Sequence, residues 1–304
     1  MTAGTVTADK GAPTRKASYG SMSRDRTWAL RWSYFFLVIF AAFFLLPPIY
    51  MFITSLKTSA EISAATNPWW VYNPTLSNYA ELLTKREYLI FFRNSVIVSV
   101  FVVTITMLIS IPAAFALSRM RFWGSATLAT GVFLTYLVPD TLLFIPLFKM
   151  FAVFHEVTGI QLLNRWWVLL VVYPTLTVPF CTWIMIGYFA SIPKELDEAA
   201  IIDGATAFQL FRLVYLPLIT PAMVAIGIYA VLLAWNEYLY AFLLMSKEKD
   251  VPLSVALGLF LSADDSPWEL LMATGFIYAL PPAVIYYVFK RYMVGGLTAG
   301  AVKA

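Results

Sequence analysis

The sequence predicts an all-α integral membrane protein with six transmembrane helices and a short cytoplasmic helix between the fourth and the fifth. Three observations predict it: the composition, the spacing of the charges and the form of the apolar runs. Of 304 residues, 61% are hydrophobic and 12% are charged, with a mean hydropathy of +0.76. Soluble domains carry about 25% charged residues. So few charges cannot cover a soluble core, which excludes a cytoplasmic globular enzyme and a disordered chain.

The spacing of the charges places the helices. An ionised side chain at the bilayer centre costs about 3 kcal/mol, and about 20 apolar residues cross the hydrocarbon. The third apolar window stops at Asp140 and resumes as TLLFIPLF, so its helix is expected to run to about residue 146. All six windows are continuous, whereas barrel strands alternate apolar and polar residues, so helices are favoured. The windows free of Asp, Glu, Lys and Arg are 32–56, 94–118, 122–139, 166–193, 213–236 and 270–289.

Three parts of the chain follow from these windows. Residues 1–32 are rich in Ser, Thr, Ala and Gly and are expected to form a disordered cytoplasmic tail. The apolar run after them is longer than the 7 to 15 residues of a signal peptide, so a cleaved signal is not expected. Residues 33–290 form the six-helix domain, which includes the polar segment 191–220, and residues 291–304 form a C-terminal tail.

The basic residues predict the orientation. With a cytoplasmic N-terminus, 13 of the 21 Lys and Arg lie on the inner side and 8 on the outer side. Loops on the cytoplasmic side carry such an excess, so both termini are expected in the cytoplasm. These basic loops also account for the sequence pI of about 9.0 without a nucleic-acid partner.

The segment between the fourth and fifth windows predicts two helices separated by a turn. Ser191 can cap the first helix, and Asp203-Gly204 ends it. Thr206 and Gln209 match a capping box that opens the second helix, which Pro217 interrupts. The first helix carries small and apolar residues that need a cover. A partner protein could supply it, and so could the protein's own helix ends.

The same segment resembles a known signature. Glu198-Ala199-Ala200 and Gly204, followed after nine residues by Val214, Leu216 and Pro217, resemble the EAA signature of permease subunits in bacterial ABC importers. The family usually has Ile where this chain has Val214, which is a mild apolar exchange. Trp235-Asn236-Glu237 and the terminal GGLTAGAVKA are similar to the maltose-type branch, the carbohydrate uptake permeases. The similarity covers roughly residues 30–304.

The resemblance implies a complex in the bacterial cytoplasmic (inner) membrane. Its expected parts are a second permease subunit, a dimer of ATP-binding subunits and an extracytoplasmic solute-binding protein that delivers a sugar or related solute. A disaccharide, an oligosaccharide, a polyol and a glycerol phosphate ester all stay open as the solute. ATP and Mg²⁺ would be bound by the partner ATPase, and this chain contains no phosphate-binding G-x-x-x-x-G-K-[ST] loop. No cofactor is expected in this chain. Its single Cys181 and single His155 supply neither a metal cluster nor a catalytic set.

The resemblance also assigns roles to residues. The EAA segment would be the coupling helix, which sits in a cleft of the ATPase and turns its closure into movement of the transmembrane helices. In the maltose-type branch the C-terminal tail reaches the ATPase as well. The residues that these roles imply are Glu198, Ala199, Ala200, Asp203 and Gly204 for coupling, and Gly296, Leu297, Gly300 and Lys303 for the tail contact.

Two acidic residues lie within reach of the bilayer. Asp140 follows the third window, and Glu237 follows Asn236 and precedes Tyr238 and Tyr240. Acidic residues at this depth usually face a cavity, and Asn236, Tyr238 and Tyr240 offer hydrogen bonds and aromatic faces to a sugar. The two acidic residues and these three neighbours are therefore candidates for the solute path. The alternative is that the two carboxylates simply extend to the lipid headgroups.

Three other functions compete with the permease. A secondary carrier predicts ionisable residues near span centres, and none of the six windows contains one. A channel predicts a selectivity filter or an Arg-rich span, and neither is seen. A membrane enzyme lacks a set of catalytic residues. A carrier or channel that works as an oligomer without an ATPase is the remaining alternative.

Overall fold

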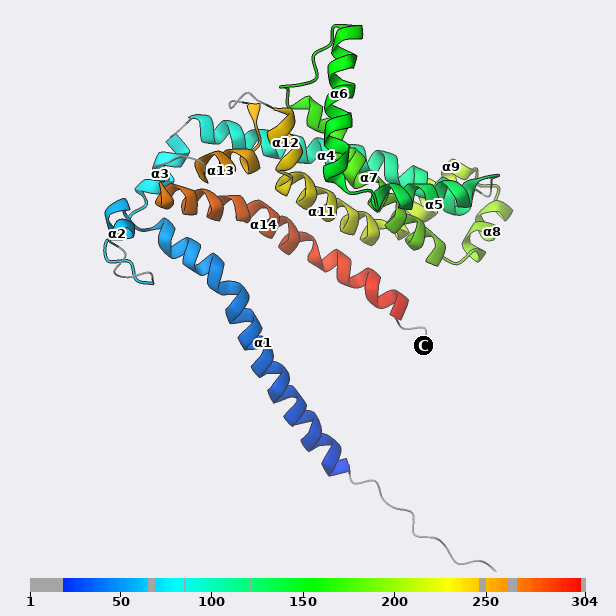
Figure 1. Ribbon diagram of the computed structural model, residues 1–304. Coiled ribbons are helices and arrows are strands. Elements are labelled where there is room, and N and C mark those ends of the chain that lie inside the picture. The colour runs from blue at the N-terminus through cyan, green and yellow to red at the C-terminus, as the bar shows by residue number, and fades with distance from the viewer. Residues whose placement is uncertain are drawn as a thin grey trace, which may run out of the picture. The chain divides into compact units, whose positions relative to one another are not determined.

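The computed structural model describes residues 19–64, 69–84, 86–120, 122–245, 250–261 and 267–301. Helices are the only regular elements in these ranges, which confirms the all-α class. The chain divides into two compact units, Met1–Tyr50 and Met51–Ala304 (Figure 1). The candidate sites all lie in the second unit.

The described part of the first unit belongs to helix α1 (Tyr19–Ser55). Trp32 lies near Trp28 and Phe35, with ring centroids 5.5 and 5.6 Å apart. The helix differs from the expected tail over residues 19–32, because Trp28, Ala29 and Leu30 extend the apolar helix toward the N-terminus. Residues 1–18 lie outside the described ranges.

Five helical stretches are long and apolar enough to cross a membrane, and they are Arg26–Ser55, Glu87–Arg119, Asp140–Thr158, Trp167–Ser191 and Trp268–Tyr292. A sixth candidate is a pair of helical stretches, Ala207–Leu218 and Thr220–Asn236, bent by 74° at Ile219. The described residues therefore provide up to six spans, in agreement with the number expected.

The third span is not the single helix that its window predicts. The chain forms α5 (Ser125–Tyr136) and then a separate α6 (Asp140–Thr158). At 1.5 Å per residue, the 12 residues of α5 cover about 18 Å, which is too short for a hydrocarbon core of about 30 Å. Pro139 lacks an N–H and is extended, with ψ at 121°, so the helix breaks before Asp140. Figure 1 shows α6 standing away from α5 and α7.

The expected outer segment 57–93 contains helices of its own. They are α2 (Ser59–Ser63), α3 (Ser77–Thr84) and the first turns of α4 (Arg86–Arg119). Asn78 is buried and donates to the carbonyl oxygens of Ser55 at 2.8 Å and Lys57 at 2.9 Å. These bonds hold α3 to the chain that follows α1.

The remaining elements continue from the fourth window. They are α7 (Trp167–Ser191), α8 (Glu195–Ile202), α9 (Ala207–Gln209), the π-helix η1 (Leu210–Tyr215), α10 (Leu216–Leu218), α11 (Thr220–Asn236), α12 (Leu239–Leu244), α13 (Leu253–Leu261) and α14 (Trp268–Ala301). Helix α14 continues past residue 290, into the segment expected to be a tail.

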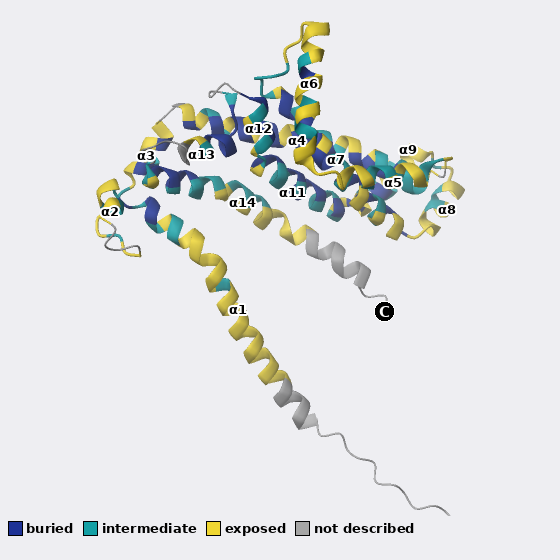
Figure 2. Ribbon diagram, viewed as in Figure 1, coloured by how far each residue is buried: buried dark blue, intermediate teal, exposed yellow. Residues whose placement is uncertain are grey.

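Buried residues of the second unit gather where α4, α7 and α11 pack together (Figure 2). They form two clusters. The first joins α4 and α7 to α12, α13 and α14, and includes Tyr173 and Tyr240. The second joins α4 and α7 to η1 and α11, and includes Phe115, Phe189 and Tyr215. The hydroxyls of Thr106 on α4 and Thr177 on α7 lie 2.6 Å apart, and both residues are fully buried.

Candidate functional site

The coupling segment predicted by the resemblance is a short exposed helix. Lys194 is the N-cap residue of α8, and Glu195, Asp197 and Glu198 occupy its first turn. Carboxylates stabilise this end of a helix because the backbone N–H groups there carry partial positive charge. The expected cap at Ser191 is wrong. Helix α7 continues to Ser191, whose Oγ donates to the carbonyl of Tyr188 at 2.8 Å.

Gly204 closes α8 in a Schellman motif. The Ala205 N–H donates to the carbonyl of Ala200 at 2.9 Å, and the Gly204 N–H donates to that of Ile201 at 3.0 Å. The backbone at Gly204 has a φ of +78°, a left-handed conformation that glycine adopts without a Cβ clash. The geometry of the turn therefore favours the glycine of the EAA signature.

The second helix of the segment begins with the expected capping box. Thr206 Oγ1 accepts the Gln209 N–H at 3.3 Å, and Gln209 Oε1 accepts the Thr206 N–H at 2.8 Å. The chain then forms η1 and α10 before it bends by 74° at Ile219 into α11. Residues 213–218 of the fifth window thus lie before the bend, because Pro217 and Pro221 remove two helical donors.

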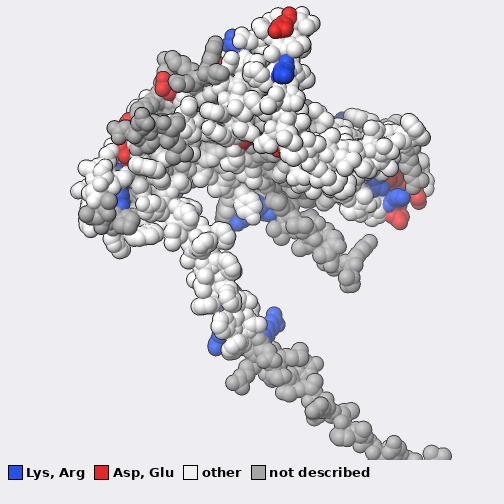
Figure 3. Space-filling view, viewed as in Figure 1, with Lys and Arg blue, Asp and Glu red and all other residues white. Residues whose placement is uncertain are grey.

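No side chain of α8 is buried. Ile201 is 65% exposed, Ile202 is 85% exposed and Phe208 in α9 is 67% exposed, while Glu198, Ala199 and Asp203 are also exposed. Figure 3 shows charged atoms of both signs gathered at the edge of this end of the unit. Apolar side chains presented this openly, next to fixed charges, are typical of a protein-binding surface.

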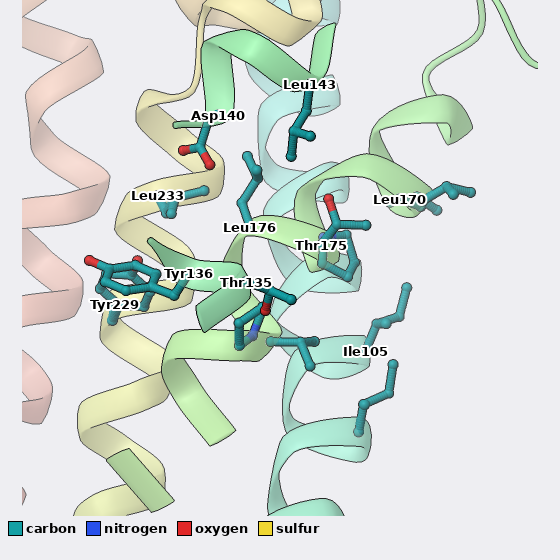
Figure 4. A pocket seen from close by; sticks show the side chains of 15 residues that line it. Ile105, Thr135, Tyr136, Asp140, Leu143, Leu170, Thr175, Leu176, Tyr229 and Leu233 are labelled. Atoms are coloured by element: carbon teal, nitrogen blue, oxygen red, sulfur yellow. The ribbon is translucent and has the colours of Figure 1, made fainter. Parts of the chain in front are cut away.

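The second candidate region surrounds a cavity of about 710 Å³. Its lining comes from α4, α5, α7 and α11 and from the first turn of α6, and it includes Thr135, Tyr136, Thr175 and Tyr229 (Figure 4). Phe180 supports both tyrosines, with ring centroids 5.0 Å from Tyr136 and 4.4 Å from Tyr229. Asp140 is the charged residue in the described lining. Of the five predicted path residues, it is also the one that reaches this cavity.

Glu237 lies beside this region as a helix cap. Its carboxylate accepts the N–H groups of Tyr240, at 3.1 and 3.2 Å, and of Ala241, at 3.4 Å. Donors at the start of α12 are thus directed at one carboxylate, an arrangement that neither the path nor the headgroup interpretation anticipated. The Tyr240 hydroxyl donates to the carbonyl oxygen of Asp140 at 2.6 Å. Burial raises the pKa of Tyr240, and the negative charges of Asp140 and Glu237 raise it further, which keeps this donor protonated.

Asn236 and Trp235 join α11 to α14. Trp235 Nε1 donates to the carbonyl of Tyr278 at 3.1 Å. In return, the Tyr278 hydroxyl donates to the carbonyl of Trp235 at 2.9 Å and contacts Asn236 Oδ1 at 3.0 Å. Tyr238 stacks on Phe242 with centroids 5.4 Å apart. The structure therefore brings Asp140, Glu237 and Tyr240 together at α12, and places Asn236 against α14.

The remaining predicted residues lie at the C-terminus. The backbone of Gly296, Leu297 and Gly300 belongs to α14, and Lys303 lies outside the described residues. In the ranges that the structure describes, no three His, Cys, Asp or Glu side chains lie close enough to hold a metal ion.

Sequence reasoning missed two groups of residues at these sites. Tyr136, Phe180 and Tyr229 were assigned to apolar windows, because only the packing of α5 on α7 and α11 brings them together. Arg119 was counted as one cytoplasmic charge, although it follows the second window directly and contacts Asp197 at 3.2 Å. Its place at a helix end, where cations stabilise carbonyl groups, was a usable signal.

Comparison with known proteins gives the same family from three directions. Residues 106–298 match the family model described as "binding-protein-dependent transport system inner membrane component". The chain is 33% identical over 259 residues to the sulfoquinovosyl glycerol transport system permease protein SmoH of Agrobacterium fabrum, covering 85% of this chain and 89% of SmoH. It is 32% identical over 269 residues to the trehalose/maltose transport system permease protein MalG of Thermococcus litoralis, covering 88% of this chain and 94% of MalG.

The fold comparison agrees. A chain of a bacterial ABC transporter involved in the import of the acidic polysaccharide alginate superimposes with a TM-score of 0.74 and 25% identity, covering 92% of this chain and 99% of that one. The apolar helices and the similarity to sugar-transport permeases along most of the sequence identify this chain as a multi-pass permease subunit of a sugar transporter. The chain belongs to the binding-protein-dependent transport system inner membrane component family.

Proposed function

We propose that this permease forms part of the path of an ATP-driven sugar importer and that α8 docks on a separate ATP-binding subunit. The observation that carries the docking is the exposed surface of α8 and α9, with Ile201 and Ile202 on α8 and Phe208 on α9 open to contact. The Schellman turn at Gly204 fixes the end of this helix in a defined shape. A rigid helix with uncovered apolar residues suits a preformed cleft on a partner.

The partner supplies the chemistry. ATP and Mg²⁺ bind to the ATP-binding dimer, whose closure displaces α8 and thereby moves the helices. A second permease subunit completes the path, and an extracytoplasmic binding protein delivers the solute, as the name of the family suggests. Both termini lie in the cytoplasm, which places α8 and the end of α14 on the side of the ATPase. Gly296, Leu297, Gly300 and Lys303 then form a second contact with it.

The cavity supports an uncharged polyhydroxy solute. Tyr136, Tyr229, Thr135 and Thr175 contribute hydroxyl groups and aromatic faces to its lining, and Asp140 contributes one carboxylate. Sugars use such hydroxyls as hydrogen-bond partners and such rings as apolar platforms. A carboxylate without a cation beside it in the described lining disfavours acidic solutes, which distinguishes this path from one suited to alginate.

The docking is tested by cross-linking. Ala200 is replaced by Cys in the complex purified in mild detergent with the subunits that accompany it, and a thiol cross-linker of short reach is added with and without ATP. The proposal requires capture of an ATP-binding polypeptide in at least one nucleotide state. If no ATP-binding polypeptide is captured in any nucleotide state, the docking proposal is refuted. The alternative of a carrier that works without an ATPase is then favoured.

The solute is tested on the binding protein. The extracytoplasmic protein that co-purifies is screened by thermal shift against maltose, trehalose, glycerol and an alginate oligosaccharide. An increase in its melting temperature with a neutral sugar supports the proposal. An increase with the alginate oligosaccharide alone contradicts it.

A further inference from the structure

A charged network fastens the inner side of α8 to three other elements. Arg119 ends α4, and its side chain is 7% exposed. Its Nη1 lies 3.2 Å from Asp197 Oδ2, and its Nη2 donates to the carbonyl of Ile192 at 2.5 Å and to that of Phe189. One guanidinium thus contacts both α8 and the C-terminal end of α7. Carbonyls at a helix end lack the full set of N–H partners of the helix interior, and there the Phe189 carbonyl also accepts the Ile192 N–H at 3.2 Å.

Asp197 receives a second donor from η1. Its Oδ1 accepts the Tyr215 hydroxyl, while its Oδ2 pairs with Arg119. The Arg119 guanidinium also lies over the Tyr215 ring, 5.1 Å from the centroid. Both carboxylate oxygens of Asp197 are therefore occupied, and the three side chains contact one another in every combination.

Packed aromatic rings fix this network in place. Tyr215 is fully buried, and its ring centroid lies 5.3 Å from that of Phe115 on α4 and 5.5 Å from that of Phe189 on α7. Phe115 and Phe189 are themselves 5.8 Å apart. The rings thus come from α4, α7 and η1, the elements that the charged network also joins.

The attachment of α8 is polar. Because no side chain of α8 is buried, burial of apolar side chains contributes little to holding the helix on the unit. The ion pair with Arg119 and the hydrogen bond from Tyr215 join Asp197 of α8 to α4 and η1. A displacement of α8 therefore acts on α4 and α7 through this contact.

We propose that Arg119, Asp197 and Tyr215 are positioning residues that transmit the movement of α8 to α4, α7 and η1. This inference rests on the proposed docking of α8 on an ATP-binding subunit, but it concerns a different face of the helix. Glu198, Ile201 and Ile202 face the partner, and Asp197 faces the bundle. Docking and transmission are thus separable by mutation.

The experiment measures the two steps separately. Docking is read from the cross-link at Ala200→Cys. Transmission is read by pulsed electron paramagnetic resonance, from spin labels at Leu128→Cys on α5 and Val284→Cys on α14, in the complex in nanodiscs with and without ATP and Mg²⁺. Leu128 and Val284 are exposed, whereas the native Cys181 is fully buried and stays unlabelled.

Asp197→Asn keeps the shape of the side chain and removes its charge. We expect the cross-link at residue 200 to persist while the ATP-dependent change in the ratio of label conformers falls about tenfold, as loss of a coupled charged contact predicts. Glu195→Gln is the matched control, because it removes the same charge from the same exposed turn. It leaves the ATP-dependent change within about twofold of the parent.

Tyr215→Phe provides a milder second variant in case the complex that carries Asp197→Asn does not assemble. It retains the ring that packs on Phe115 and Phe189 and removes only the hydroxyl that donates to Asp197. We expect about a threefold smaller response to ATP at an unchanged yield of complex.

The outcomes distinguish this inference from the docking proposal. If the parent chain gives no cross-link to an ATP-binding subunit, the docking proposal fails. If the cross-link forms and both Asp197→Asn and Tyr215→Phe respond to ATP like the parent, the docking proposal stands and the positioning role is overturned. If Glu195→Gln reduces the spin-label response to ATP as much as Asp197→Asn does, the positioning role is overturned as well. The loss then results from removing any negative charge at this end of α8.

Discussion

The two ends of the second unit hold their acidic side chains in different ways. At α8, Asp197 is paired with the guanidinium of Arg119 and the hydroxyl of Tyr215. At α12, Glu237 is held by backbone N–H groups of Tyr240 and Ala241. A side-chain pair joins separate helices, whereas a cap stabilises one helix. The α8 end is thus built to pass displacement between elements, and the α12 end to keep a short helix in shape beside a cavity.

The largest effect is expected at the turn of α8. Gly204→Pro cannot adopt the φ of +78° and loses the N–H that bonds to Ile201, at a cost of about 3 kcal/mol. We expect the ATP-driven conformational change to fall about a hundredfold, since about 1.4 kcal/mol is a factor of ten. The measurement is the spin-label response of the complex.

Gly204→Asn is the matched control for this turn. Asn enters the left-handed region more readily than other residues, and a Cβ at this position meets nothing within 4 Å. A response in Gly204→Asn close to that of the parent assigns the effect of proline to the backbone. Equal loss in both variants contradicts this explanation.

A smaller effect is expected at the α12 cap. Glu237→Ala removes the acceptor of the α12 N–H groups, which costs about 1 kcal/mol and lowers the melting temperature of the purified chain by about 3 °C. The cross-link at residue 200 remains unchanged, because α12 is not part of the α8 surface. Glu237→Gln retains an acceptor oxygen and recovers most of the stability. A lost cross-link in Glu237→Ala disproves the separation of the two ends.

The negative charge in the cavity is expected to change the rate at which charged thiol reagents label a cysteine in its lining. Thr135→Cys places a thiol in the lining that contains Asp140. A cationic methanethiosulfonate reagent is expected to label it about fivefold faster than an anionic one of similar size, because a carboxylate attracts cations. Asp140→Asn removes the preference, and an uncharged reagent reports any change in access. A preference that survives Asp140→Asn shows that another group sets the charge of the cavity.

The smallest effect is expected when the same substitution, Tyr to Phe, is made at the α12 end and compared with the α8 end. Tyr278→Phe removes the hydroxyl that bonds to the carbonyl of Trp235 and costs about 1 kcal/mol of stability, as for a single hydrogen bond. We expect its spin-label response to equal that of the parent, unlike the response of Tyr215→Phe. Thermal unfolding and the labels are measured on the same samples. Equal loss of response in the two variants abolishes the distinction between a transmitting end and a supporting end.

What the sequence predicted well is local. The capping box at Thr206 and the turn at Gly204 depend on residues within a few positions of one another, so spacing alone located them. The apolar windows located α4, α7 and α14, because the cost of placing a charge in lipid applies to each stretch separately.

What it predicted poorly depends on packing. The break at Pro139 divided the helix that was expected to continue to about residue 146, since a proline within an apolar run leaves open whether the helix kinks or ends. The cap at Glu237 requires α12, whose six residues gave no periodic signal. The network at Arg119 joins residues 78 positions apart. No spacing rule reaches that far.

The buried pair of hydroxyls between Thr106 and Thr177 limits how α4 and α7 can move relative to each other. If α4 slid along α7, it would separate two polar groups in a medium that offers them no water, a cost that tilting the helices together avoids. The pair lies between the two buried clusters. A tilt of α4 and α7 about this pair would keep the two hydroxyls together while the opposite ends of each helix moved in opposite directions.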